Sequence, residues 1–340
     1  MLSDHISIVL TTNPIPVHPN TDMLSDVLNS FVHLSDEIYK CHLVMIFDGY
    51  KEFEESEPKS GRATAQEIVN YNEYKSRAKS LVMNLFKRSE DDWTHTTRVE
   101  RVKTSAGRHY CDLHISQLEQ VDSHAHLTFV EILEPRIGFA LGVREGLRLI
   151  ATPYVLVAQH DWVFERNVPL AKILQTMDDF DQVKYVGFLS KWNLDYSELR
   201  ALRMGFPSAE IHDAPWDLNL CRLYFWYDRT HVCKTAHYQS LVFCNHGLKR
   251  GHFIEDTFGQ AMMKDIREGK TESDSLERHA KYGTFLYFQE PDQVYLRHLH
   301  GRKYHQRALV EAQLSNLPPR PDHTFIDPFE LDHLFTSLQN

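Results

Sequence analysis

Gln159, His160 and Asp161 follow the apolar run Tyr154–Ala158, which is typical of a buried β-strand. In open α/β sheets, ligands bind at the carboxyl ends of the strands. A carboxylate at such a position suits a divalent cation that also holds phosphate oxygens, and an imidazole can be a further ligand. The simpler interpretation is a polar strand end at which a histidine–aspartate hydrogen bond holds a loop.

Polar residues also end the first two predicted strands of the chain. They are Thr11, Thr12 and Asn13 at the first strand and Asp48 at the second. Hydroxyl and carboxylate oxygens there could accept hydrogen bonds from a nucleoside. Asp48 precedes a glycine, and Asp-Gly is equally an ordinary turn signal, so this interpretation stays open as well.

Glu255 and Asp256 begin a predicted helix at residues 253–266. Acidic side chains are favoured in a first helical turn because the helix dipole stabilises them, which requires no function. The alternative is a general base that faces a cleft.

His298 and His300 alternate along a predicted strand at residues 294–299. Because side chains of a strand alternate between its faces, both imidazoles would lie on one face. That arrangement favours metal binding, although a solvated polar strand would show the same pattern. The aromatic stretch Leu223–His231 could stack on sugar rings, but a buried core strand is the favoured interpretation.

The composition excludes several classes of protein. The 340 residues carry a formal charge of −10, which argues against a nucleic-acid-binding protein. The sequence has neither an apolar run of the ~18 residues that a membrane span needs nor a signal peptide. Its five cysteines form no Cys-x-x-Cys pair, which is typical of reduced thiols. We therefore expect a globular cytoplasmic protein without a membrane span.

Strands and helices alternate in the first half of the chain, which favours a parallel sheet covered by helices. The polar strand ends would then lie along one edge of that sheet. Strands are predicted at residues 5–12, 42–49, 127–133, 154–158, 184–189, 220–227, 284–288 and 294–299, and helices near residues 23–31, 63–86, 138–150 and 253–266.

Residues 136–161 resemble the central block of inverting, family-2-type glycosyltransferases of the GT-A fold. The block reads RIGFALGVREGLRLIATPYVLVAQHD. The stretches IVLTTN, MIFDGY, IEDTF and HLHG are similar to further blocks of that family in the same order. The resemblance covers about residues 1–50 and 130–305, and residues 51–127 have no counterpart.

Two departures from the family pattern concern the metal. Gln159 replaces the first aspartate of the family's Asp-x-Asp motif, and the second strand keeps one aspartate, Asp48, instead of two. Gly138 and Gly146 match family glycines, while Arg136 and Arg144 stand where asparagines are common. The fold is therefore expected to hold, while the number of metal ligands stays open.

The resemblance implies an α/β fold with a Rossmann-like, mostly parallel central sheet flanked by helices and a smaller mixed sheet on the acceptor side. It implies transfer of a sugar from a nucleotide-diphosphate sugar, with UDP expected, to a hydroxyl acceptor with inversion and with Mn²⁺ or Mg²⁺. The implied donor-binding residues are Thr11, Thr12, Asn13, Asp48, Arg136, Arg144, Gln159, His160 and Asp161; the metal ligands are Asp161 with His298 or His300; and Asp256 is the base, oriented by Glu255.

The expected organisation is one domain at residues 1–310 and a tail at 311–340. The nucleotide-binding half would span about 1–165, with an insertion at 51–127, and the catalytic half about 166–310. Two other functions stay open. One is a metal-dependent hydrolase that uses His124, His126, His160, Asp161, His298 and His300, and the other is a non-catalytic nucleotide-sugar-binding protein on the same scaffold.

Overall fold

The computed structural model describes residues 1–53, 62–86, 93–104, 109–120, 126–133, 135–194, 196, 201–211, 214–244, 247–289, 293–301 and 304. Contacts divide the chain into two units, Met1–Arg302 and Lys303–Asn340. The fold is that of the first unit, which holds nearly all of both predicted halves. The predicted tail at 311–340 and the candidate hydrolase ligand His124 lie outside the described residues.

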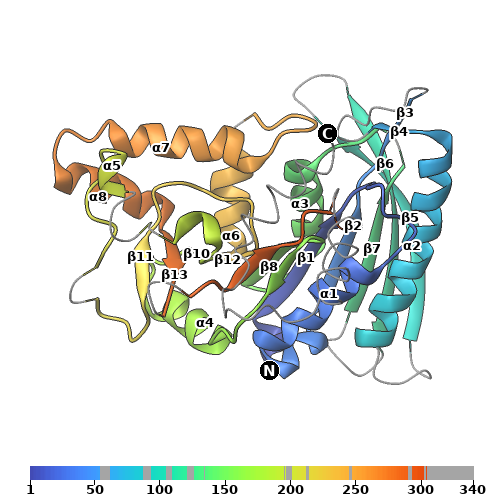
Figure 1. The fold of residues 1–340 in the computed structure, drawn as a ribbon, viewed down its shortest axis with the longest axis horizontal. Helices are drawn as coiled ribbons and strands as arrows, with labels where there is room; N and C mark the ends of the chain where they lie inside the picture. The colour runs from blue at the N-terminus through green and yellow to red at the C-terminus, as the bar shows by residue number, and fades with distance from the viewer. Residues whose placement is uncertain are drawn as a thin grey trace, which may run out of the picture. The chain divides into compact units, whose positions relative to one another are not determined.

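A ten-stranded sheet forms the centre of the described part of the chain (Figure 1). The fold is α/β, as predicted, and most strands share one direction, with β11, β12 and β6 reversed. In spatial order the strands are β11 (Leu220–Arg222), β13 (Thr284–Tyr287), β10 (Tyr185–Phe188), β12 (His231–Lys234), β8 (Tyr154–Gln159), β1 (Ile6–Thr12), β2 (Leu43–Phe47), β7 (His126–Ile132), β6 (Tyr110–Gln120) and β5 (Trp93–Lys103).

The central strands are buried on both faces because helices cover both. Tyr74 of one helix bonds Thr12 of β1, whereas Gly146 of another lies against Val9. Side chains alternate along a strand, so these two helices lie on opposite faces of β1. The helices are α1 (Asp22–Ser30), α2 (Ala65–Phe86), α3 (Phe139–Leu147), α4 (Leu170–Asp179), α5 (Ala201–Arg203), α6 (Thr235–His237), α7 (Gln260–Arg267) and α8 (Glu272–Tyr282), with π-helices at Tyr238–Phe243 and Glu255–Gly259.

The described part of residues 51–127 adds two strands to the central sheet, which sequence patterns did not predict. Strands β5 and β6 form a long antiparallel hairpin, and β6 pairs with β7. Burial alternates along β6 at residues 111–115, as in a sheet covered on one face, whereas the outer strand β5 is exposed along most of its length. Helix α2 covers β7 and the ends of β1 and β2.

Two short sheets accompany the central one. Strands β9 (Trp162–Phe164) and β14 (Leu296–His298) pair antiparallel, and β3 (Lys51–Glu52) pairs with β4 (Arg62–Ala63) in parallel. The predicted strand at 220–227 is shorter than expected, because β11 ends at Arg222 and the aromatic residues after it form a loop. In the described residues, no helix combines the length and the apolar character that crossing a membrane requires.

Gly138 lies where two backbones come close together. Its φ is +84°, and a Cβ at this position would lie 2.7 Å from the Cα of Gly251. We expect Gly138→Ala to lower the free energy of unfolding by about 1–3 kcal/mol because of the left-handed backbone and the clash. Thermal and urea denaturation measure the change.

Gly142→Ala, four residues along α3, is the matched control. A Cβ there would make an ordinary 3.5 Å contact with Ile46, so alanine should be neutral or stabilising, by up to about 1 kcal/mol. Equal stability of the Gly138→Ala and Gly142→Ala variants would show that the approach of Gly138 to Gly251 is not tight.

Candidate active site

The polar ends of the central strands lie side by side at the carboxyl edge of the sheet. Thr11 is in register with Gln159 of β8 and with Ile46 of β2, and Thr12 is in register with Phe47, the residue before Asp48. This juxtaposition follows from parallel pairing, as the strand alternation predicted. The N-terminal flank of the reversed strand β12 arrives at the same edge.

Asp161 and His298 meet at this edge. The Nε2 atom of His298 lies 3.0 Å from Oδ2 of Asp161. The pairing of β9 with β14 brings His298 opposite Trp162, and its imidazole stacks on the indole ring at 4.6 Å. Burial acts to raise the pKa of Asp161, but the hydrogen bond from His298 and the nearby His160 outweigh it, so the pKa is lowered. Asp161 is therefore a carboxylate at neutral pH.

The pair can provide part of a divalent-cation site. Oδ1 of Asp161 is buried and has no hydrogen-bond partner among the described residues. These residues include no group of three or more His, Cys, Asp or Glu side chains arranged to hold a metal. Mg²⁺ and similar cations often bind one or two carboxylates and take their other ligands from substrate phosphates and water. Asp161 and His298 thus fit a cation completed by a bound diphosphate.

His300 does not join this pair in the same way. Its ring packs beside that of His298 at 4.3 Å, and its backbone has a φ of +55°. Asp161 receives its hydrogen bond from His298. Between the two predicted histidine ligands, the geometry favours His298.

His160 points into the protein interior. Its Nδ1 lies 3.3 Å from the carbonyl oxygen of Thr11, and burial lowers its pKa. His18 lies close to it; burial, with a smaller contribution from His160, lowers the pKa of His18 to about 3. Both imidazoles are therefore neutral at pH 7 and support the loop after β1.

Helix α2 covers the strand ends that were predicted to bind the nucleoside. The hydroxyl of Thr12 bonds that of Tyr74 at 3.1 Å, and Tyr71 donates to the carbonyl oxygen of Asp48. Thr11 and Thr12 are buried, whereas Asn13 is partly exposed in the following loop. Nucleoside binding by these residues stays a prediction, and Asn13 is the most accessible of the three.

Asp48 is surrounded by donors from its own protein. Its Oδ1 accepts from the backbone N–H groups of Gly49 (2.8 Å) and Ile137 (2.9 Å), and its Oδ2 accepts from Gly138 N–H (3.0 Å) and Arg136 Nε (3.2 Å). Burial raises the pKa of Asp48, and Arg136 and the backbone donors oppose that rise. Asp48 therefore holds the loop before α3, a role that the Asp-Gly turn signal alone did not show.

The loop held by Asp48 in turn holds the segment before Glu255. Gly251 donates to the carbonyl oxygen of Ile137 at 2.8 Å, and Arg250 donates to that of Arg136 at 3.0 Å. The close approach of Gly138 and Gly251 belongs to the same contact. A chain of backbone contacts thus connects the end of β2 to the acidic pair at 255–256.

Arg144 has partners on another surface. Its guanidinium bonds Glu145 and the carbonyl oxygen of Lys103 at the end of β5. The structure therefore does not bring Arg144 to Asp161, and Arg136 forms an ion pair with Asp48. Phosphate binding by either arginine stays a prediction that these contacts do not favour.

Glu255 and Asp256 begin a π-helix, Glu255–Gly259, that continues into α7. Single turns of π-helix are frequent at functional sites. Glu255 is half-buried, and its Oε2 accepts from the backbone N–H of Asp228 at 3.2 Å, whereas Asp256 is exposed. The two acids therefore differ in environment, with Glu255 tied to the protein and Asp256 facing outward.

Asp228 and Arg229 are functional candidates that sequence reasoning missed. Both lie at the end of the aromatic stretch, immediately before β12, and the side chain of Asp228 is buried. The carbonyl oxygen of Asp228 accepts from Gln159 Nε2 at 2.7 Å. The sequence pattern that could have identified them is the one seen at residues 159–161, where charged residues adjoin a short apolar strand. Trp226 and Tyr224 of that stretch are fully buried, which confirms the core interpretation for them.

Arg229 adds a guanidinium group beside Trp162 and Ser190. Its guanidinium bonds the hydroxyl of Ser190 and lies over the rings of Tyr227 (4.7 Å) and Trp162 (5.5 Å). Because Trp162 also stacks on His298, one indole ring connects Arg229 with the Asp161–His298 pair. Cation–π contacts of this kind are attractive and help to hold a guanidinium in place.

The carboxyl groups of Asp228 and Glu255 have raised pKa values. Burial raises the pKa of Glu255, and the Asp228 N–H and Arg229 oppose that rise. Burial and the charge of Glu255 raise the pKa of Asp228 well above its usual range. Titratable groups perturbed in this way often mark functional sites.

The histidines proposed for a hydrolase do not come together. His126 begins β7 at the amino edge of the sheet, where its ring packs on that of His42. Asp161 and His298 lie at the carboxyl edge. Among the described residues, the histidines that the hydrolase interpretation requires therefore do not assemble into one metal site.

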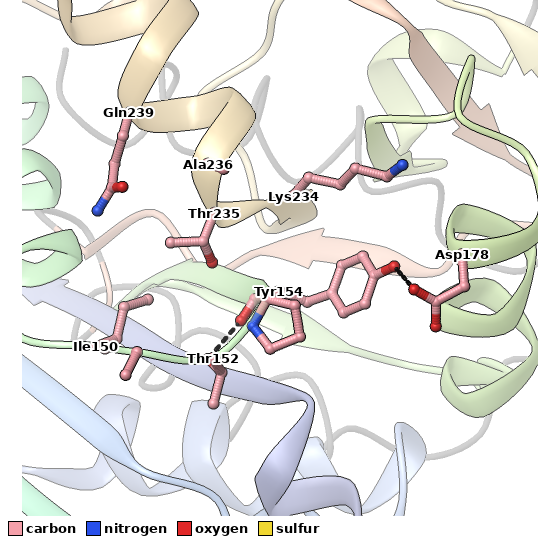
Figure 2. Close-up of a pocket in the computed structure, with 10 residues that line it drawn as sticks. Ile150, Thr152, Tyr154, Asp178, Lys234, Thr235, Ala236 and Gln239 are labelled. Carbon is pink, nitrogen blue, oxygen red and sulfur yellow. Dashed lines mark hydrogen bonds between the residues drawn. The ribbon is translucent and has the colours of Figure 1, made fainter.

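A pocket at the opposite, amino edge of the sheet is lined by other residues (Figure 2). It has a volume of about 460 Å³ and lies beside the start of β8. Figure 2 shows Tyr154 bonded to Asp178 across it, with Thr235 and Gln239 on the far side. None of the predicted site residues lines this pocket, so it is not the candidate active site.

Comparisons with known proteins give low similarity throughout. No protein-family model and no curated protein matches the sequence. The structure of residues 1–349 of TarS from S. aureus is similar over 93% of this chain and 67% of its own, with 12% identity and a TM-score of 0.35. The structure of the same TarS fragment with UDP-GlcNAc covers 93% of this chain and 68% of its own, with 11% identity and a TM-score of 0.34. UDP-glucose pyrophosphorylase from Acinetobacter baumanii is similar over 98% of this chain and 99% of its own, with 10% identity and a TM-score of 0.41. Similarity at this level identifies neither a family nor an activity.

Proposed function

We propose that this protein is an inverting glycosyltransferase that moves a sugar from a nucleotide-diphosphate sugar, with UDP as the expected nucleotide, to a hydroxyl acceptor. The observation that carries the proposal is the arrangement of charge at the carboxyl edge. Asp161 bonds His298, Gln159 bonds Asp228, and Asp228 bonds Glu255; the ring of Trp162 lies against both Arg229 and His298.

The leaving group of this reaction is a nucleoside diphosphate, on which negative charge grows in the transition state. Arg229 provides fixed positive charge near the centre of the site. Asp161 and His298 would hold a divalent cation, Mn²⁺ or Mg²⁺, which stabilises diphosphate charge when bound. His298 as a ligand favours Mn²⁺. Arg229 thus takes the phosphate-binding role that the resemblance implied for Arg136 and Arg144.

The acceptor hydroxyl needs a base before it can attack. Asp256 is exposed at the start of the π-helix, where an acceptor could reach it, and we assign it as the general base. Glu255, tied to Asp228 N–H, fixes the turn that carries Asp256. A single displacement with inversion requires the base to act on the face of the sugar opposite the leaving group.

Binding of UDP tests the donor half of this proposal. We expect UDP with Mn²⁺ to raise the melting temperature, because a ligand that binds the native state stabilises it by about 2.7 kcal/mol at 100 times its Kd. Asp161→Ala should abolish the metal-dependent part of this shift and leave the unliganded protein folded. Differential scanning fluorimetry with UDP, GDP and a UDP-sugar panel measures it.

His300→Ala is the control. Asp161 receives its hydrogen bond from His298, so His298→Ala should lose the metal-dependent shift, whereas His300→Ala should retain most of it. If no nucleoside diphosphate shifts melting in the presence of metal, the glycosyltransferase proposal is wrong. A shift without turnover of any UDP-sugar would support the non-catalytic binding protein instead.

A further inference from the structure

Asp228 makes three hydrogen bonds to two segments that are far apart in the sequence. Its carbonyl oxygen accepts from the side chain of Gln159 at 2.7 Å. Its carboxyl Oδ2 accepts from the backbone N–H of Ile254 at 2.8 Å, and its own N–H donates to Oε2 of Glu255 at 3.2 Å. The residue is 3% exposed, and its bond to the N–H of Ile254 is buried.

The bond to Ile254 fixes the start of a helix. Ile254 directly precedes the π-helix at Glu255–Gly259, and the first N–H groups of a helix have no partner within the helix itself. Asp228 supplies an acceptor for one of them from a distant part of the chain. The bond from Asp228 N–H to Glu255 holds the next residue of the same turn.

We propose that Asp228 is a positioning residue that sets the Glu255–Asp256 turn against Gln159, and so sets the distance between the general base and the donor. This inference rests on the proposed function, because it assigns Asp256 as the base. A displacement of about 1 Å in such a geometry can lower a rate about 100-fold. Asp228 itself touches neither the reacting sugar nor the diphosphate in this role.

The role requires an acceptor atom of the right reach and does not require a negative charge. Oδ1 of Asp228 is buried and has no hydrogen-bond partner among the described residues, an environment that disfavours the charged carboxylate. Burial raises the pKa of this carboxyl group, and the charge of Glu255 raises it further. Asparagine has the same reach and keeps one oxygen acceptor, so it should replace Asp228.

The test compares Asp228→Asn with Asp228→Glu in the full chain. We expect Asp228→Asn to keep kcat within about threefold of the wild type, whereas Asp228→Glu, one methylene longer, should lower kcat about 10- to 100-fold by displacing the turn. UDP affinity, measured calorimetrically with Mn²⁺, should change less than twofold in both. A catalytic carboxylate would give the opposite order, and that order would overturn the inference. So would wild-type kcat in both variants.

Hydrogen exchange gives a readout that needs no turnover. The amides of residues 254–259 should keep their protection in Asp228→Asn and lose it in Asp228→Glu, while those of α3 stay unchanged. If Asp228→Glu does not fold, Asp228→Ala takes its place with the same expectation. A wild-type protein that cleaves no UDP-sugar would refute the proposed function, whereas unchanged exchange at 254–259 in the Glu or Ala variant would refute the positioning role of Asp228.

Discussion

Asp256→Asn should lower transfer to the acceptor about 100- to 10,000-fold, which is the usual contribution of a general base. Asparagine keeps the size of the side chain and loses its basicity. Donor affinity should stay within about twofold, because the base acts on the acceptor's proton and has no contact with the nucleotide. Loss of rate with unchanged donor binding is the signature of an interaction made in the transition state. UDP release from a UDP-sugar panel, with calorimetry of UDP binding, measures both.

Asp274→Asn is the matched control for this experiment. Asp274 lies in the first turn of α8, accepts from Lys270 N–H at 2.9 Å and pairs with Arg278, so it is a helix-start acid with a structural role. It should lose some stability and no activity. If Asp256→Asn behaves in the same way, Asp256 is a helix-start acid and not the base. Retention of the donor's anomeric configuration in the product would exclude a single displacement.

Asp48→Ala should lower the free energy of unfolding by about 3–5 kcal/mol, the range for removing one partner of a buried charge pair. The change leaves the N–H groups of Ile137 and Gly138 without their acceptor and removes the ion pair of Arg136 with Asp48. Asp48→Asn should also be destabilising, because each carboxyl oxygen accepts from two donors and an amide nitrogen would face one such pair. Chemical denaturation measures both variants.

Asp217→Ala is the comparison for a carboxylate with a weak role. Asp217 is exposed and pairs with Lys172 at the surface, so its loss should change stability by less than about 1 kcal/mol. A nucleoside ligand at position 48 predicts a different pattern, with lost UDP affinity and an unchanged melting temperature. That outcome would support nucleoside binding by Asp48, as the sequence suggested, and would contradict its structural role.

Strand ends and their order were predictable because parallel pairing brings carboxyl ends together whatever the loops do. Thr11, Gln159 and Asp48 were placed at one edge on that basis alone. Their partners were not predictable, since the hydrogen bonds of Asp48 come from residues about 90 positions away. The hairpin β5–β6 was missed because its exposed outer strand is rich in charged and hydroxyl residues and lacks the apolar signal of the central strands.

Asp228 and Arg229 were missed for a related reason. Aromatic residues dominate the stretch around them, and buried aromatic residues usually form core, as Trp226 does. The stretch was therefore predicted as a strand through residue 227, whereas β11 ends at Arg222. No local pattern shows that the chain then turns back to the carboxyl edge, because that path depends on β12 pairing with both β8 and β10.

The reversed direction of β11 and β12 has a consequence for how such proteins can diverge. Strands β11 and β12 both run opposite to β10, so the segment between β10 and β11 begins and ends at the carboxyl edge, where the candidate active site lies. The entropy of closing a loop rises only slowly with its length. Residues can therefore be gained or lost between Ser190 and Leu220 without breaking any strand pairing, and the acceptor side can change over evolution while the donor side stays constant.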